Sequence, residues 1–232
     1  MRTSKQINQI ELTHSMPVRL LNAISSESIT SLIDYYNISN SIIQKNTGPK
    51  VCVINEGDDV IDNILESLRT EFGNFKVRTA HYFDVSTPHI VHVDDDFNYS
   101  NSYKAFTIPL LTEGADCNLA KLIFFDQYYY GGPAKFIRNG PANKVEYYNK
   151  NLYVYDDVKG LNNNGIPANV LSMLSHLRPQ WLEGLSINSY FPWTIGSVIA
   201  FDSLQLHCAS NFKEQGITRK LGISIFTTLD KE

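Results

Sequence analysis

Five short segments of this 232-residue chain constrain its fold more than any other feature. Each is rich in β-branched or aromatic residues and is bounded by turn residues, a pattern that favours antiparallel strands. The segments are Phe75–Phe83, Lys104–Leu111, Lys121–Asp126, Ser197–Phe201 and Leu221–Thr228. Strands this short bury a common interior most readily as a double-sheet jelly roll, whose mouth can hold a ligand.

Two helices are expected before these strands. Ser25 or Ser26 can cap the first, whose apolar residues recur at helical spacing: Ile29, Leu32, Ile33 and Tyr36. Asp58 or Asp59 can cap the second, and Gly73 can end it. Its apolar face comprises Val60, Ile61, Ile64, Leu65, Leu68 and Phe72. Helices followed by many strands indicate the α+β class.

The interval between the third and fourth strand segments breaks this rhythm. It contains runs of Tyr, Gly, Asn and Pro and one helix-like stretch that stops at Pro179. We therefore expect one domain over residues 1–232, with helical support in 1–74, barrel strands in 75–126 and 193–228, and an insertion in 127–192. The insertion is either a substrate-side cover or a structural excursion, and the sequence favours neither.

Composition excludes some partners. The formal net charge of −4, with Lys and Arg dispersed, gives no electrostatic footprint for nucleic acid or an anionic membrane. Three cysteines without CxxC spacing indicate neither a disulfide framework nor a zinc knuckle. No signal peptide or membrane-spanning run is evident, so we expect a soluble cytoplasmic protein acting on a small-molecule or peptide substrate. The oligomeric state is left open.

The chemistry-bearing motif is His92-Val93-Asp94. Residues i and i+2 of an extended segment share a face, so an imidazole and a carboxylate point the same way. A distant His207 can complete a set of two histidines and one carboxylate, the facial triad of non-haem Fe(II) oxygenases. Asp96 is the alternative carboxylate, but only Asp94 has the two-residue spacing. His89 has the opposite parity and is expected beside the metal site or in solvent.

Several motifs, taken in order, carry a resemblance to a known family. They are Tyr82, His92-Val93-Asp94, Gly196 to Asp202, His207, Asn211 and Arg219. This ordered set resembles the 2-oxoglutarate- and Fe(II)-dependent dioxygenase superfamily, particularly its prolyl-hydroxylase-like and phytanoyl-CoA-hydroxylase-like branches. The resemblance covers residues 75–228 without the insertion and implies a double-stranded β-helix, which is a jelly roll.

The resemblance also implies residue roles. His92, Asp94 and His207 match the catalytic iron ligands, which leave two positions for 2-oxoglutarate and one for O2. Arg219 matches the residue that pairs with the far carboxylate of 2-oxoglutarate, and Tyr82 matches a tyrosine that hydrogen-bonds this cosubstrate. Arg219 shares a strand face with Leu221, Ile223 and Ile225, which we expect to point into the barrel. Lys220, on the other face, is a second candidate. The chain lacks the small hydroxyl residue that many relatives have after this arginine, and Thr107 is an alternative source.

The implied activity is a hydroxylation that releases succinate and CO2. Two other classes stay open: a cupin-like metalloenzyme that uses no keto acid, and a jelly-roll binding module with an inactive site. Arg219 favours the oxygenase over the former, because a keto acid anchor has no purpose without the keto acid.

Overall fold

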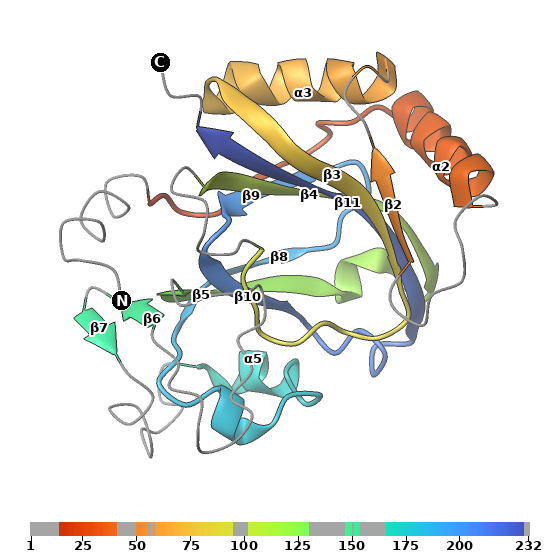
Figure 1. The fold of residues 1–232 in the computed structure, drawn as a ribbon. Coiled ribbons are helices and arrows are strands. Elements are labelled where there is room, and N and C mark those ends of the chain that lie inside the picture. The colour runs from red at the N-terminus through yellow and green to blue at the C-terminus, as the bar shows by residue number, and fades with distance from the viewer. Residues whose placement is uncertain are drawn as a thin grey trace.

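The computed structural model describes residues 14–40, 50–54, 57, 59–94, 102–129, 147–149, 151–153 and 166–229. Within them, two antiparallel sheets face each other (Figure 1). The helical elements are α2 (Ser26–Asn40), α3 (Asp59–Phe72), η1 (Cys117–Leu119), α5 (Ala168–Ser172) and η2 (Pro179–Trp181).

The larger sheet, called the major sheet below, has six strands in the order β1-β9-β4-β11-β3-β2. Their bounds are β1 Val18–Leu20, β2 Lys50–Ile54, β3 Phe75–Val85, β4 Ser102–Gly114, β9 Val198–Asp202 and β11 Ile217–Leu229. The minor sheet joins β10 to β5, and β5 pairs with both β6 and β8. Its bounds are β5 Lys121–Tyr129, β6 Tyr147–Asn149, β7 Asn151–Tyr153, β8 Ile187–Pro192 and β10 Gln205–Ala209.

Both faces of the major sheet are buried. Its outer face packs against α2 and α3, which lie over the sheet in Figure 1, through a core that includes Leu32, Leu65, Ile223 and Ile225. Its inner face meets the minor sheet through Ala105, Phe124, Phe201 and their neighbours. The α+β class and the double-stranded β-helix with supporting helices are therefore confirmed.

The helices form where the apolar spacing predicts. Ser25 precedes α2, and its hydroxyl accepts a hydrogen bond from the backbone N–H of Ser28 at 3.2 Å, as an N-cap should. Gly73 ends α3 with a φ of 82°, and its N–H donates to the carbonyl of Arg69. Of the two candidate caps of α3, Asp58 lies outside the described residues, and Asp59 is the first residue of the helix.

Part of the expected insertion at 127–192 belongs to the barrel itself. Residues 127–129 complete β5, and β8 pairs with β5, so both ends of the interval 127–192 belong to the minor sheet. Residues 166–185 pack on the outer face of this sheet, where Val170 and Leu174 join a core with Ile123 and Phe125. Residues 130–146, 150 and 154–165 lie outside the described residues. The strand β8 at 187–192 is not predicted by the sequence pattern, because Asn188 and Ser189 are polar and Pro192 cannot donate a backbone hydrogen bond.

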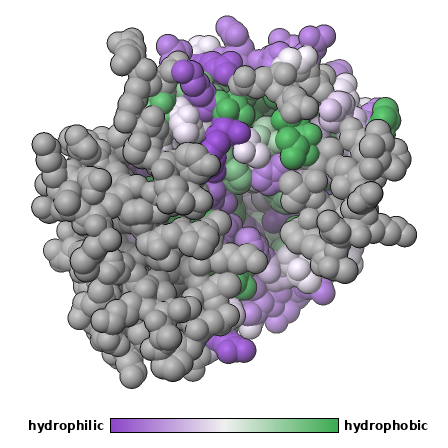
Figure 2. Space-filling view, in the orientation of Figure 1, coloured by the Kyte–Doolittle hydropathy of each residue, from purple (hydrophilic) through white to green (hydrophobic). Residues whose placement is uncertain are grey.

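No described helix is long and apolar enough to cross a bilayer. On the face shown in Figure 2, hydrophilic and hydrophobic described residues are interspersed.

Candidate metal centre and inner pocket

Strand alternation places the three predicted metal ligands on one inner surface. Val91 and Val93 are buried in the core outside the minor sheet, so His92 and Asp94 between and after them turn inward. In β10, Leu206 and Cys208 enter the same outer core, which turns His207 inward. Two backbone hydrogen bonds of 3.0 Å join His92 to His207, and the N–H of Asp94 donates to the carbonyl of Ser203 at 2.9 Å.

The three side chains converge on one point. Asp94 Oδ1 lies 3.4 Å from His92 Nε2, and Asp94 Oδ2 lies 3.5 Å from His207 Nε2. One ligand atom from each residue lies within 4.8 Å of the others. Both imidazoles are buried, with 8% of His92 and 2% of His207 exposed. Two imidazole nitrogens and one hard carboxylate fit Fe(II) or a similar divalent ion.

Backbone carbonyls fix the orientation of both histidines. His92 Nδ1 lies 2.8 Å from the carbonyl oxygen of Ile90, and His207 Nδ1 lies 2.9 Å from that of Gln205. A carbonyl oxygen only accepts, so each Nδ1 carries the proton and donates it. Each Nε2 then keeps a lone pair directed at the common point, as metal ligation requires.

The electrostatics favour the ligand protonation states. Burial and the neighbouring His207 lower the pKa of His92 and outweigh the opposing effect of Asp94. Burial by itself would raise the pKa of Asp94, but interactions with His207 and His92 outweigh it and hold that pKa below its ordinary value. A neutral His92 and an ionised Asp94 are therefore favoured at neutral pH.

Two further histidines lie near the triad. His89 is exposed, and its Nδ1 lies 3.2 Å from His92 Nε2, although His89 is not part of the three-residue cluster. His81 lies on β3, where the charge of Asp94 opposes the lowering of its pKa by burial. Asp96, the alternative ligand, lies outside the described residues.

The structure places Arg219 and Tyr82 away from the triad. The expectation that Leu221, Ile223 and Ile225 point into the barrel is wrong, because all three pack beneath α2 and α3. Arg219 shares their face and pairs with Asp84, with Nε 2.8 Å from Oδ1, and with Glu113. Tyr82 is buried in the same helix-side core, where its hydroxyl donates to the carbonyl of Leu32 at 2.9 Å.

The residues on the opposite face of β11 enter the barrel. Lys220 is 3% exposed, and its Nζ lies 3.6 Å from the centroid of the Trp193 ring and 5.0 Å from that of Phe212. Burial lowers the pKa of Lys220 to about 7. No hydrogen bond or ion pair joins this amine to another described residue. The sequence does contain a signal for this orientation: Lys220, Gly222 and Ser224, which share one face of β11, are small or polar, as residues that line a binding cavity often are.

Thr107 is also an inner residue. Its strand neighbours Phe106 and Ile108 belong to the helix-side core, so Thr107 points the other way. It pairs in register with Ser224, which in turn pairs with His81 on the next strand. These three polar residues lie side by side across the inner face of the major sheet.

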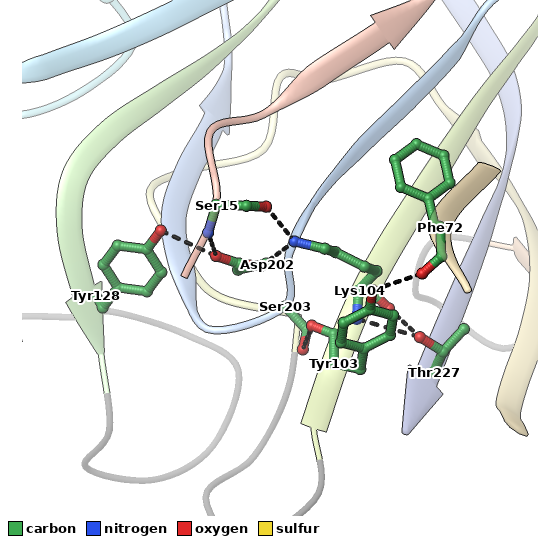
Figure 3. Close-up of polar contacts among 8 residues, drawn as sticks. All are labelled: Ser15, Phe72, Tyr103, Lys104, Tyr128, Asp202, Ser203 and Thr227. Carbon is green, nitrogen blue, oxygen red and sulfur yellow. Dashed lines mark hydrogen bonds and ion pairs between the residues drawn. The ribbon is translucent and has the colours of Figure 1, made fainter. Parts of the chain in front are cut away.

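A buried ion pair supports the end of β9 (Figure 3). Lys104 and Asp202 are 5% and 6% exposed, and the Lys104 ammonium contacts the carboxylate of Asp202 and the hydroxyl of Ser15. The same carboxylate accepts hydrogen bonds from the N–H of Ser15 at 2.7 Å and from the hydroxyl of Tyr128 at 3.1 Å. Asp202 precedes Ser203, whose carbonyl holds Asp94. No local sequence pattern predicts this pair, because its two residues are 98 positions apart.

Comparisons with known proteins support the fold. No protein-family model and no curated protein sequence matches the chain. Among solved structures, the chain is similar to the non-heme alpha-ketoglutarate-dependent epimerase SnoN from nogalamycin biosynthesis (TM-score 0.52, 8% identity, 97% of this chain and 83% of SnoN covered). It is also similar to the carbocyclase SnoK from the same biosynthesis (TM-score 0.50, 11% identity, 98% and 84% covered). A Pseudomonas putida prolyl-4-hydroxylase aligns at a TM-score of 0.48 with 9% identity over 96% of this chain and 97% of that one.

The similarities to SnoN and SnoK concern the fold, that is, the arrangement of the two sheets. At 8% and 11% sequence identity they say nothing about activity. Together with the strand order, they establish that this chain has the double-stranded β-helix fold found in 2-oxoglutarate-dependent non-heme enzymes.

Proposed function

We propose that the protein is an Fe(II)- and 2-oxoglutarate-dependent dioxygenase that hydroxylates a small-molecule or peptide substrate. The observation that carries the proposal is the convergence of His92, Asp94 and His207 on one buried point, with the Nδ1 atoms of both histidines held by backbone carbonyls and their Nε2 atoms turned toward that point. This ligand set leaves adjacent coordination positions open.

The assigned roles follow from position. His92, Asp94 and His207 hold Fe(II), and Lys220, buried without an anionic partner among the described residues, pairs with the far carboxylate of 2-oxoglutarate. Lys220 thus takes the role that the sequence suggested for Arg219. Thr107, on the inner face, is retained as a hydroxyl contact to the cosubstrate. Tyr82 has no such role, because its hydroxyl faces the helices.

The protein supplies placement and the metal supplies the redox chemistry. When bound, Fe(II) would supply the oxidation: one atom of O2 would enter the substrate, and the other would enter the succinate that 2-oxoglutarate forms on loss of CO2. Phe124 and Phe201, whose ring centroids lie 5.8 and 4.7 Å from that of His207, shield the ligands from water. The structurally similar proteins named above include an epimerase and a carbocyclase. Hydroxylation is proposed for this protein because it is the commonest outcome of this chemistry.

Anaerobic titration of the Fe(II)-loaded protein with 2-oxoglutarate tests the proposal. Bidentate chelation should produce a visible metal-to-ligand charge-transfer band in the wild type. The band should vanish in His92→Ala, Asp94→Ala and His207→Ala, each of which should also lose Fe(II). Asp96→Ala is the matched control and should keep both.

Other results point to the other classes. Tight Fe(II) binding without the band would favour a cupin-like enzyme that uses no keto acid. Failure to bind Fe(II) at all would indicate a binding module. Loss of Fe(II) in Asp96→Ala equal to that in Asp94→Ala would overturn the ligand assignment.

A further inference from the structure

Two buried residues, Trp193 and Lys220, carry hydrogen-bond donors without acceptors among the described residues. One is the indole Nε1–H of Trp193, a residue that is 1% exposed. The other is the amine of Lys220, a residue that is 3% exposed and whose Nζ lies over the rings of Trp193 and Phe212. Buried donors are almost always satisfied in native proteins, so two such donors in contact indicate a missing acceptor.

The backbone of β11 is shaped to admit the Trp193 ring. A Cβ on Gly222 would lie 2.7 Å from Phe83 Cζ, 2.9 Å from the carbonyl oxygen of Ile108 and 3.0 Å from Trp193 Cζ2. Cζ2 is the ring atom next to the carbon that carries Nε1. The nitrogen-bearing edge of the indole therefore lies over Gly222, on the inner face that Lys220 and Ser224 share.

The inner polar surface continues from this point toward the triad. Ser224 follows Gly222 on the same face and pairs in register with Thr107 and His81. On the strand that carries His81, Arg78 Nη2 lies 3.5 Å from the carbonyl oxygen of Asp94, which places β3 beside the candidate metal ligands. A linear dicarboxylate bound at the triad by one end would thus have polar neighbours along its course and the two unpartnered donors at its far end.

We propose that Trp193 donates a hydrogen bond through Nε1–H to the far carboxylate of the cosubstrate, alongside Lys220, and so selects a dicarboxylic keto acid over a monocarboxylic one. The inference rests on the proposed function. Many relatives have a small hydroxyl residue shortly after the basic residue that binds 2-oxoglutarate, and this chain lacks it. In our proposal the indole of Trp193 supplies the second hydrogen-bond donor instead. Trp193 touches the cosubstrate in this arrangement, and its ring face at the same time packs against the lysine.

The first test observes the indole directly. The chain has two tryptophans, so the Zn(II)-loaded, ¹⁵N-labelled protein should show two indole N–H resonances, which Trp181→Phe assigns. Adding 2-oxoglutarate should move the Trp193 indole proton downfield, as a new hydrogen bond to a carboxylate does. Adding 2-oxovalerate, which has the keto acid end but no far carboxylate, should not. A resonance that stays in place with saturating 2-oxoglutarate would overturn the proposal.

The second test measures selectivity. Trp193→Phe keeps a ring beside Lys220 but removes the N–H, so its affinity for 2-oxoglutarate should fall roughly tenfold to a hundredfold in the Fe(II)-loaded protein. Its affinity for 2-oxovalerate should be unchanged. Trp181→Phe is the matched control, because Trp181 lies on η2 against Arg178, and it should bind both keto acids as the wild type does.

The remaining outcomes separate the two proposals. Equal losses for both keto acids in Trp193→Phe would show that the ring only shapes the pocket, and unchanged affinity for both would show that the N–H is not used. Either result overturns the role of Trp193 and leaves the proposed function intact. If the wild type itself does not bind 2-oxoglutarate, both fall together.

Discussion

One residue of offset along β11 decides which basic side chain enters the barrel. Arg219 and Lys220 are adjacent, so they point to opposite faces of the major sheet. Arg219 is about one-third exposed and already paired with Asp84 and Glu113, whereas Lys220 is buried beside Trp193. An anion that binds inside the barrel can therefore be neutralised by Lys220 and not by Arg219.

Replacing each of these two basic residues in turn tests which one binds the cosubstrate. Lys220→Met should weaken 2-oxoglutarate binding by about 2 to 5 kcal/mol, because the far carboxylate would be buried without a charge partner. Arg219→Gln should leave the affinity unchanged and cost at most about 1 kcal/mol of stability, since its ion pairs are partly solvent-screened. Titration of the Fe(II)-loaded variants measures the first effect and denaturant unfolding the second. A reversed order of the two affinities would mean that Lys220 is not the anchor.

The same lysine should make cosubstrate binding depend on pH. Burial lowers the pKa of Lys220 to about 7 in the ligand-free protein, so the amine is protonated below that pH and neutral above it. A bound dicarboxylate requires the ammonium, so binding above about pH 7 takes up a proton, and the apparent affinity should fall by up to about tenfold per pH unit. Calorimetry in two buffers of different ionisation enthalpy measures the uptake. Lys220→Met should abolish it, and uptake that persists in this variant would assign the proton to another group.

At the scale of elements, the turn between β9 of the major sheet and β10 of the minor sheet connects the ion pair to the candidate metal ligands. Lys104 of β4 holds Asp202 at the end of β9, the next residue accepts the N–H of Asp94, and β10 then carries His207. This turn therefore joins two residues of the triad through backbone contacts, and its stiffness depends on a charge pair that is itself buried.

Breaking one side of that pair should be worse than replacing both. Lys104→Met or Asp202→Leu alone should destabilise the fold by about 3 to 5 kcal/mol, because each leaves one buried charge without its partner. The double variant Lys104→Met/Asp202→Leu should be more stable than either single variant. Chemical denaturation of all four proteins measures the coupling. Additive losses would show that the two charges do not depend on each other.

At the scale of the whole molecule, a metal bound by the triad would link the segment that carries His92 and Asp94 to β10 in the minor sheet. A ligand that binds only the folded state adds about 2.7 kcal/mol at a concentration a hundredfold above its Kd. For a chain of this size, this corresponds to a rise in Tm of roughly 5 to 10 °C. Thermal unfolding of apo and Zn(II)-loaded protein should show this difference, and Asp94→Ala should remove it. An equal rise in Asp94→Ala would place the bound metal elsewhere.

Local sequence determined the elements and most of the metal site. The helical spacing of Ile29 to Tyr36 and the strand segments from Phe75 onward predict the observed α2, β3, β4, β5, β9 and β11, because amphipathic periodicity depends on residues close in the chain. The two-residue spacing of His92 and Asp94 likewise predicts a shared face. The double-stranded β-helix also follows, since many short antiparallel strands have few other ways to bury one interior.

Only the tertiary structure decided which face of β11 is the inside. Strand alternation places Arg219 on the same face as Leu221, and Lys220 on the same face as Ser224. Both faces of the major sheet are buried, however, one by α2 and α3 and the other by the minor sheet. Hydrophobicity therefore cannot distinguish the helix side from the barrel side, and the more apolar face proved to be the one beneath the helices. The contacts of Lys220 with Trp193 and of Lys104 with Asp202 join segments that are distant in the sequence, so no local pattern encodes them.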